Sequence, residues 1–440
     1  SRDRRSLSMP RPFPLQLLAI TASPALAQPV PDPLSQAERD AIDTLFAPEA
    51  DRFDSGVALV LLRNGKVFYE NTWHGFDESI AWPIASSTKW ISGLAIARQI
   101  AEDPGYDVTS AVGEFIPSFE AQPLKAGITL AELFTHSSGI SPRPTYNRDV
   151  SLTMEQAADL IAGVPLLGPP GGQIFYGGCS MQVAGRMTEL RTGEPWADFA
   201  ASRLFGPLEM ARTDYLAFTS PPGTPTDNPN VAGSIRTTLA DYARFLAALD
   251  EGGLVRARRV IPAAAYDTLF TDYTGLGIEI ESSPYQVYEP FAPGSAAFRT
   301  GFGCFIDPTR IRPDGSVGWA TSAGAFGTNA WVDSDRDFTG VMFTYVIDRT
   351  IDGQPVPYNP ATRFFLEEVR PLVEASIEPV ERPVFDPDLN RDGVVSFLDV
   401  AAYPSLFFEV EPVIDIATPF GTISQADVTA FVDAFFAGRP

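Results

Sequence analysis

Strand-like segments at both ends of the chain enclose a mainly helical middle, and this order constrains the fold most strongly. The stretch VALVLLRNGKVFYENTW (57–73) has two apolar, β-rich runs joined at Asn64-Gly65, which is typical of a hairpin. Helical spacing of apolar residues predicts helices at 35–47, 90–100, 153–163, 179–191, 195–204, 239–250 and 359–376. Strands are expected within 275–282, 298–306, 316–333 and 338–347. We therefore expect one α+β domain whose sheet is assembled from both ends of the chain.

The charge of the chain narrows the class of partner. There are 55 acidic and 32 basic residues, which give a formal net charge of −23. Binding to nucleic acid or to an anionic membrane surface needs clustered positive charge, so neither is expected. A hydrophobic content of 45% favours a packed globular protein.

The first residues resemble an export signal. Four arginines within the first eleven residues precede the apolar run LQLLAI, and Ala25-Leu26-Ala27 fits an A-x-A cleavage site. We expect residues 1–27 to be a signal peptide and the exported protein, periplasmic or extracellular, to start at Gln28. No later run is long enough to suggest a membrane span.

Lysine is rare in this chain, which directs attention to IASSTKWISG (84–93). The only three lysines are Lys66, Lys89 and Lys125. If Ser86 starts a helix, Lys89 lies one turn further on the same face, near the serine hydroxyl. A desolvated lysine with a lowered pKa can act as the base for a serine nucleophile. The alternative is a serine cap followed by a solvated lysine.

Further motifs in the chain give this pair a family context. LFTHSSGI (133–140), LFGPLEM (204–210), SIRTTLADYARFLAAL (234–249) and GAFGTNAWVDSDRDFTGVMFT (324–344) occur in the expected order. With S-x-x-K at Ser86 and Lys89, they resemble the serine β-lactamase and penicillin-binding superfamily. Within this superfamily, they resemble the branch that holds class C β-lactamases, DD-carboxypeptidases and family VIII esterases. The resemblance spans residues 40–375 and implies an antiparallel sheet with flanking helices plus a helical subdomain.

Two other motifs of that superfamily are incomplete. Y-x-N falls at Tyr176, but Gly178 stands where the family has asparagine. The third motif, Lys or His followed by a small residue and Gly, falls at Ser322-Ala323-Gly324 and lacks its base. The resemblance makes Gly178, Ser322 and Gly324 substrate-binding positions, and Gly324 is expected because substrate approaches the backbone there.

The resemblance also implies a mechanism. Ser86 is the candidate nucleophile, Lys89 and Tyr176 share the proton transfer, and the N–H groups of Ser86 and Ala325 form the oxyanion hole. No G-x-S-x-G elbow is present, and His74 and His136 are too few for a zinc site and favour structural roles.

The incomplete motifs bear on the substrate. Loss of the basic residue and the asparagine weakens binding of a β-lactam or a peptide terminus, so we expect an esterase or acyl-transfer hydrolase acting on a small ester or amide. The alternatives are a weak β-lactamase or DD-peptidase, a catalytically silent penicillin-binding-like receptor, or an assembly component.

Cys179 and Cys304 are the only cysteines, and an exported chain with an even count invites a disulfide. Two isolated buried thiols are the alternative.

The end of the chain predicts a separate small module. We place the hydrolase domain at 28–376, an acidic, proline-rich linker at 377–385 and the module at 386–440. DVAAYPSLFF (399–408) recurs as DVTAFVDAFF (427–436), which indicates a pseudo-symmetric helical pair. DLNRDGVVSFLD (388–399) matches a calcium loop whose ligands are Asp388, Asn390, Asp392, Val394, Ser396 and Asp399.

The second copy of this loop, at 415–427, keeps Asp415 and Asp427 as ligands of a less regular calcium site. The pattern resembles an all-α, EF-hand-like dockerin module, which implies a cohesin-like protein partner. No cofactor is expected for catalysis.

Overall fold

The structure is a computed structural model that describes residues 33–221, 223–255, 258–274, 279–282, 299–312, 315–347, 350–351, 354–355 and 359–380. The expected signal peptide and the expected calcium-binding module lie outside these residues. Among the described helices of this part, none is long and apolar enough to cross a bilayer.

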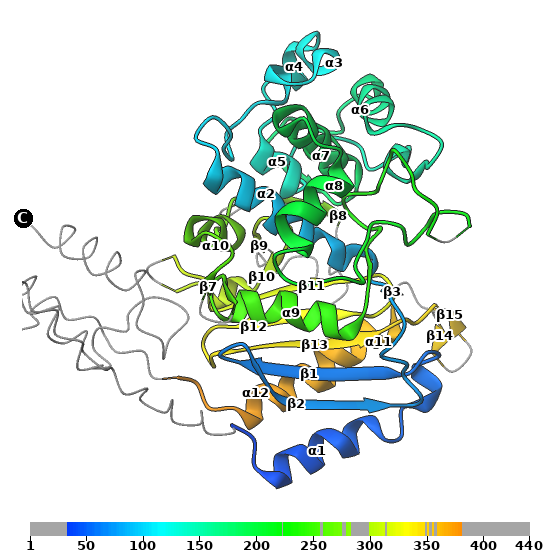
Figure 1. Cartoon of the computed structure of the whole chain (residues 1–440), viewed down its shortest axis with the longest axis vertical. Helices are drawn as coiled ribbons and strands as arrows, with labels where there is room; N and C mark the ends of the chain where they lie inside the picture. The colour runs from blue at the N-terminus through cyan, green and yellow to red at the C-terminus, as the bar shows by residue number, and fades with distance from the viewer. Residues whose placement is uncertain are drawn as a thin grey trace, which may run out of the picture. The chain divides into compact units, whose positions relative to one another are not determined.

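Seven of the described strands form one antiparallel sheet that joins the two ends of the domain (Figure 1). Its spatial order is β2-β1-β13-β12-β11-β10-β9, so the N-terminal hairpin pairs directly with a late strand, as expected. In that pairing Val57 lies opposite Thr344 and Leu62 opposite Thr339. The bounds are β1 Val57–Arg63, β2 Lys66–Trp73, β9 Arg299–Thr300, β10 Phe305–Ile306, β11 Trp319–Ala323, β12 Asn329–Asp333 and β13 Phe338–Thr344.

Short strand pairs lie outside this sheet. They are β3 Trp82–Pro83 with β5 Arg236–Thr237, β4 Gln173–Phe175 with β8 Glu279–Ser282, β6 Leu254–Val255 with β7 Arg258–Arg259, and β14 Thr350–Ile351 with β15 Gln354–Pro355. The segment 275–282 was expected to be a strand, and its described part pairs in parallel with β4 instead of extending the main sheet.

The described helices are α1 Gln36–Phe46, α2 Thr88–Glu102, α3 Pro117–Glu120, α4 Pro123–Ala126, α5 Leu130–Phe134, α6 Met154–Gly163, α7 Cys179–Thr192, α8 Trp196–Ala200, α9 Leu239–Asp250, α10 Ala263–Phe270, α11 Pro360–Phe364 and α12 Arg370–Ser376. All seven predicted helical segments are helical, whereas α3, α4, α5 and α10 are helices that the sequence pattern did not predict. Two π-helical turns, η5 Ala201–Phe205 and η7 Phe365–Val369, continue α8 and connect α11 to α12. The 3₁₀ turns are η1 Ala50–Arg52, η2 Ala85–Ser87, η3 Val112–Glu114, η4 Tyr146–Arg148 and η6 Pro308–Arg310.

Both faces of the sheet are covered, because alternate side chains of β1 enter different cores. Ala58, Val60 and Leu62 pack in the core that contains α2 and α9. Val57, Leu59 and Leu61 pack in the core that contains α1, α11 and α12. Figure 1 shows α1 and α12 on one side of the sheet and the helical region on the other. This is the α+β architecture with a helical subdomain that the sequence predicts.

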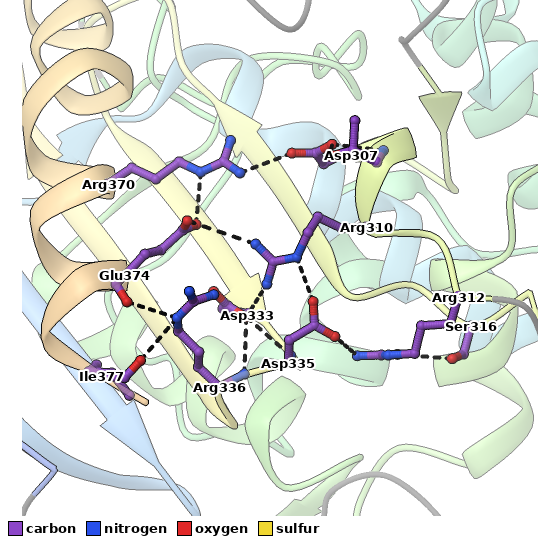
Figure 2. Close-up of polar contacts among 11 residues, drawn as sticks. Asp307, Arg310, Arg312, Ser316, Asp333, Asp335, Arg336, Arg370, Glu374 and Ile377 are labelled. Atoms are coloured by element: carbon purple, nitrogen blue, oxygen red, sulfur yellow. Dashed lines mark hydrogen bonds and ion pairs between the residues drawn. The ribbon is translucent and has the colours of Figure 1, made fainter. Parts of the chain in front are cut away.

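An ion-pair network fixes the closing helix to the turn between β12 and β13 (Figure 2). Asp333, which is fully buried, accepts from Arg310 at 2.9 Å and from Arg336 at 3.2 Å. Arg336 also donates to the backbone carbonyls of Glu374 and Ile377, at the end of α12. These bonds satisfy carbonyls that a helix end leaves without partners.

Candidate active site

Ser86 lies in η2, the 3₁₀ turn that leads directly into α2. The residue before it, Ala85, has a φ of +47°, in the left-handed region that an alanine rarely adopts. Such a conformation costs about 1–3 kcal/mol and persists where surrounding structure imposes it, often at functional sites. Backbone N–H groups in the first turn of a helix lack intrahelical partners, so the setting of Ser86 suits developing negative charge.

Lys89 lies one turn further along, and its ammonium group reaches back to Ser86. Its Nζ donates to Ser86 Oγ at 3.0 Å and to the Ala232 carbonyl at 2.8 Å. Burial, and to a smaller extent the positive charge of Arg148, lower the pKa of Lys89 from 10.5 to about 7. A lysine with this pKa is partly neutral near pH 7 and can accept a proton from a neighbouring hydroxyl.

Tyr176 follows β4 and precedes α7, and its ring lies beside the lysine. The distance from Lys89 Nζ to the ring centroid is 4.8 Å. Burial raises the pKa of Tyr176 to about 12, although the nearby Ser86 side chain acts in the opposite direction. The Tyr176 hydroxyl has no hydrogen-bond partner of good geometry among the described residues. At neutral pH Tyr176 is therefore protonated and able to donate, and Lys89 is the better base of the two.

His136 packs against Tyr176, with 4.6 Å between the ring centroids. The sequence predicts a structural role for His136. Its Nδ1 has no partner among the described residues, and its backbone carbonyl accepts from Phe175 N–H at 2.9 Å. Burial lowers the pKa of His136 to about 3, so its ring is neutral.

The third motif lies where β11 ends beside η2. A Cβ on Gly324 would overlap the carbonyl oxygen of Ile84, two residues before Ser86. The chain's own backbone therefore requires this glycine, which is a reason beyond the approach of substrate that the sequence suggests. Ser322 is buried and lines a small cavity of about 10 Å³ that Ser86 also borders. Ala325 instead lines a second, much larger cavity that Ser86 borders as well.

Gly178 stands where the second motif has asparagine. The sequence did not predict the residue that packs against it, Asn147. A Cβ at this position would overlap the side-chain amide of Asn147, which comes from η4. Asn147 Nδ2 donates to Asn230 Oδ1 at 3.0 Å, and the same oxygen accepts from Ala232 N–H at 3.1 Å. Because the Ala232 carbonyl accepts from Lys89, this chain of bonds connects Asn147 to the lysine. No motif in the sequence marks Asn147 or Asn230.

The large cavity in front of Ser86 has a volume of about 550 Å³, within the range of small-molecule sites. One part of its wall is apolar, including Val150, Phe218 and Phe326. Another part is polar and carries Lys89, Asn147 and Asn230 together with Arg143 and Arg148. The structure thus brings the expected residues Ser86, Lys89, Tyr176, Gly178 and Ala325 to one cavity.

Cys179 and Cys304 are both free thiols, so the expected disulfide is not formed. Each sulfur has a different partner: Cys179 donates to the Pro144 carbonyl at 3.3 Å, and Cys304 donates to the Leu269 carbonyl at 3.6 Å. Each thiol is buried within its own surroundings, as in the alternative of two isolated thiols.

The predicted calcium ligands between 388 and 427 lie outside the described residues. Within the part of the chain that is described, no group of three or more His, Cys, Asp or Glu side chains is arranged to hold a metal ion.

Comparison with known proteins places this geometry in a family. The family model described as Beta-lactamase matches residues 43–349. A D-aminopeptidase of Cereibacter sphaeroides is 28% identical over 205 residues, which cover 42% of this chain and 36% of the relative. The match therefore spans little more than a third of that relative's length.

Solved structures agree on the fold. A candidate beta-lactamase from Bacteroides dorei DSM 17855 superimposes with a TM-score of 0.64 at 21% identity, over 78% of this chain and 99% of that one. EstCE1, a hydrolase with promiscuous acyltransferase activity, gives a TM-score of 0.55 at 16% identity, over 70% and 93% of the two chains. Since the family model covers well over half of the 440 residues, the chain belongs to the beta-lactamase family.

Proposed function

We propose that this protein is a serine hydrolase that forms an acyl-enzyme on Ser86, most simply an esterase or acyl-transfer hydrolase for a small ester or amide. The observation that carries the proposal is the 3.0 Å contact between Ser86 Oγ and the Nζ of a lysine whose pKa lies near 7. A nucleophile and base within hydrogen-bond reach are the minimum for this chemistry.

The roles follow from the protonation states. Neutral Lys89 takes the proton of Ser86 as Oγ bonds to the substrate carbonyl carbon, and the N–H groups of Ser86 and Ala325 stabilise the oxyanion. As the intermediate collapses, the proton passes from Lys89 to the leaving group, with protonated Tyr176 as a donor beside it. Water, or a second alcohol, then attacks the ester carbonyl on Ser86 and releases the acyl group.

The esterase proposal follows from the two incomplete motifs. Ser322 carries no charge at the third motif. At the second motif Gly178 has no side chain, and the neighbouring Asn147 amide nitrogen already donates to Asn230. Loss of a charge-assisted bond costs about 1.5–3 kcal/mol, or roughly a factor of ten to a hundred in binding. A weak β-lactamase or DD-peptidase is the alternative outcome. The named relative, a D-aminopeptidase, is the reason to test D-amino acid amides as well.

Labelling of Ser86 tests this proposal. The protein and its Ser86→Ala variant would be treated with a fluorophosphonate, and then with short-chain nitrophenyl esters, D-alanine nitroanilide and a chromogenic cephalosporin. We expect label on Ser86 alone, ester turnover that the variant lacks, and slow cephalosporin turnover. Fast cephalosporin turnover would contradict the esterase assignment, and the absence of any label would favour the silent receptor.

The proposal includes the regions outside the described residues. We propose export to the periplasm or beyond, and calcium binding by the 388–399 loop with a less regular second site bounded by Asp415 and Asp427. A cohesin-like partner is proposed for this module. Calcium titration of the full chain by calorimetry, with Asp392→Ala as the control, should show a site that the variant loses; equal heats in the two proteins would exclude that loop.

A further inference from the structure

Two arginine side chains in the cavity of Ser86 have no partner among the residues that the structure describes. Arg143 and Arg148 both line this cavity, and neither side chain forms an ion pair or hydrogen bond with any described residue. Most other described arginines are paired, as Arg236 is with Asp214 at 2.8 Å. The chain has a net charge of −23, so carboxylates are plentiful. A shortage of acidic partners therefore does not explain why these two arginines are unpaired among the described residues.

Asn147, which lies between the two arginines in the sequence, is buried and holds their segment in place. Asn147 is 3% exposed and bonds to Asn230, so the segment 143–148 is held at the cavity wall. From there Arg148 acts on the reacting groups, because its positive charge lowers the pKa of both Lys89 and Tyr176. Arg148 lines the same cavity as Ser86, so its guanidinium group faces the space that a molecule bound at Ser86 would fill.

Positive charge at this wall favours an anionic ligand. Arg148 and Lys89 repel one another when both are charged, and a bound anion would offset this repulsion. A guanidinium group is also suited to a carboxylate, since it can donate two parallel hydrogen bonds. The apolar wall with Val150, Phe218 and Phe326 leaves room for an alkyl chain beside this charge.

We propose that Arg148, assisted by Arg143, binds a carboxylate on the acyl part of the substrate that Ser86 attacks. The inference rests on the proposed function, because it names the class of ester that the same site prefers. The preferred substrates are then esters of a dicarboxylic acid that retain one free carboxylate.

A matched pair of esters tests the subsite. 4-Nitrophenyl hydrogen adipate and 4-nitrophenyl hexanoate have acyl chains of equal length and differ in a terminal carboxylate or methyl group. The wild-type protein should prefer the adipate in kcat/KM, mainly through KM, and this preference should weaken as NaCl is added. In Arg148→Gln the preference should fall by about ten-fold or more, and Arg143→Gln/Arg148→Gln should remove it.

Two further variants serve as controls. Arg212 is exposed and has no side-chain partner among the described residues, but it lies away from the cavity lining, so Arg212→Gln should keep the preference. Arg148→Lys retains the positive charge and should keep part of the preference for the adipate ester. Thermal unfolding of each variant checks that the fold is intact, and the salt dependence of the wild type needs no variant.

The outcomes separate this inference from the proposed function. Turnover of both esters with an unchanged ratio in Arg148→Gln would overturn the carboxylate subsite and leave the hydrolase in place. An equal shift of both pH profiles toward higher pH, with no change in ratio, would also overturn it, because Arg148 would then act only on Lys89. No turnover of either ester above the Ser86→Ala background would refute the proposed function itself.

Discussion

The side-chain amide of Asn147 occupies the space into which any side chain at residue 178 would project. The two residues come from η4 and from the turn before α7, and the glycine is what permits their contact. Asn147 therefore supplies an amide to the cavity at the place where the family motif has its own asparagine. The space that the asparagine side chain would fill at residue 178 is therefore occupied by the amide of Asn147.

This relationship predicts a reciprocal pair of variants. Gly178→Asn alone should destabilise the protein by about 1–3 kcal/mol, because it overfills a packed site. Asn147→Ala alone should reduce kcat/KM by removing the bond to Asn230. The double variant should recover stability and part of the activity, as measured by urea unfolding and ester turnover. Strictly additive effects would show that the two positions do not share this space.

The pKa of Lys89 predicts the pH dependence of acylation. Because burial lowers this pKa to about 7, the neutral base becomes more abundant as pH rises through 7, and kcat/KM for a neutral ester should rise and then level off. Lys89→Arg, which stays charged, should be inactive throughout. A profile that keeps rising toward pH 10, where an ordinary lysine titrates, would contradict the buried environment of Lys89.

Loss of Asp333, which belongs to the network in Figure 2, should destabilise the protein more than loss of Glu367, which lies outside that network. Asp333→Ala should lower the free energy of unfolding by about 3–5 kcal/mol, since it leaves the Arg310 and Arg336 charges without their buried partner. Glu367→Ala removes an exposed pair with Arg363, at 2.8 Å, and should cost less than about 1 kcal/mol. Similar losses in the two variants, measured by urea unfolding, would mean that Asp333 does not anchor α12.

Free thiols predict a simple alkylation result. Cys179 and Cys304 are buried, so iodoacetamide should modify neither residue in the native protein. In urea without any reductant, both thiols should react, and intact mass should show two adducts. A requirement for reductant would indicate the disulfide that the structure does not contain.

The elements of this fold were predictable from the sequence because local pattern determines them. The boundaries of α1 follow from the Ser35–Glu38 capping box, and those of α2 from its apolar spacing. The approach of Lys89 to Ser86 follows from the same helical geometry. In each case the interacting residues lie within a few positions of one another.

The remaining features of the site depend on contacts between distant segments. The bond from Asn147 to Asn230 and the contact of Asn147 with Gly178 arise only when the 143–148 segment packs against α7 and the 228–234 segment. The same packing leaves Arg148 at the cavity wall, without an ion pair among the described residues. The positive φ of Ala85 is likewise imposed by its surroundings and has no glycine to signal it. The cysteine count left a disulfide and two isolated thiols equally open, because it carries no information on where the two sulfurs lie.

The central claim is that Ser86 becomes acylated with Lys89 as its base, and rapid acid quench with intact mass tests it most directly. After mixing with 4-nitrophenyl hexanoate, the protein should gain one hexanoyl group, and peptide mapping should place this group on Ser86. In the Lys89→Met variant, the acyl group should form several orders of magnitude more slowly. The unfolding temperature of this variant should be no lower than that of the wild type, so that the slower rate is not due to unfolding. An acyl group found on another residue, or one that forms at the same rate without Lys89, would contradict the account.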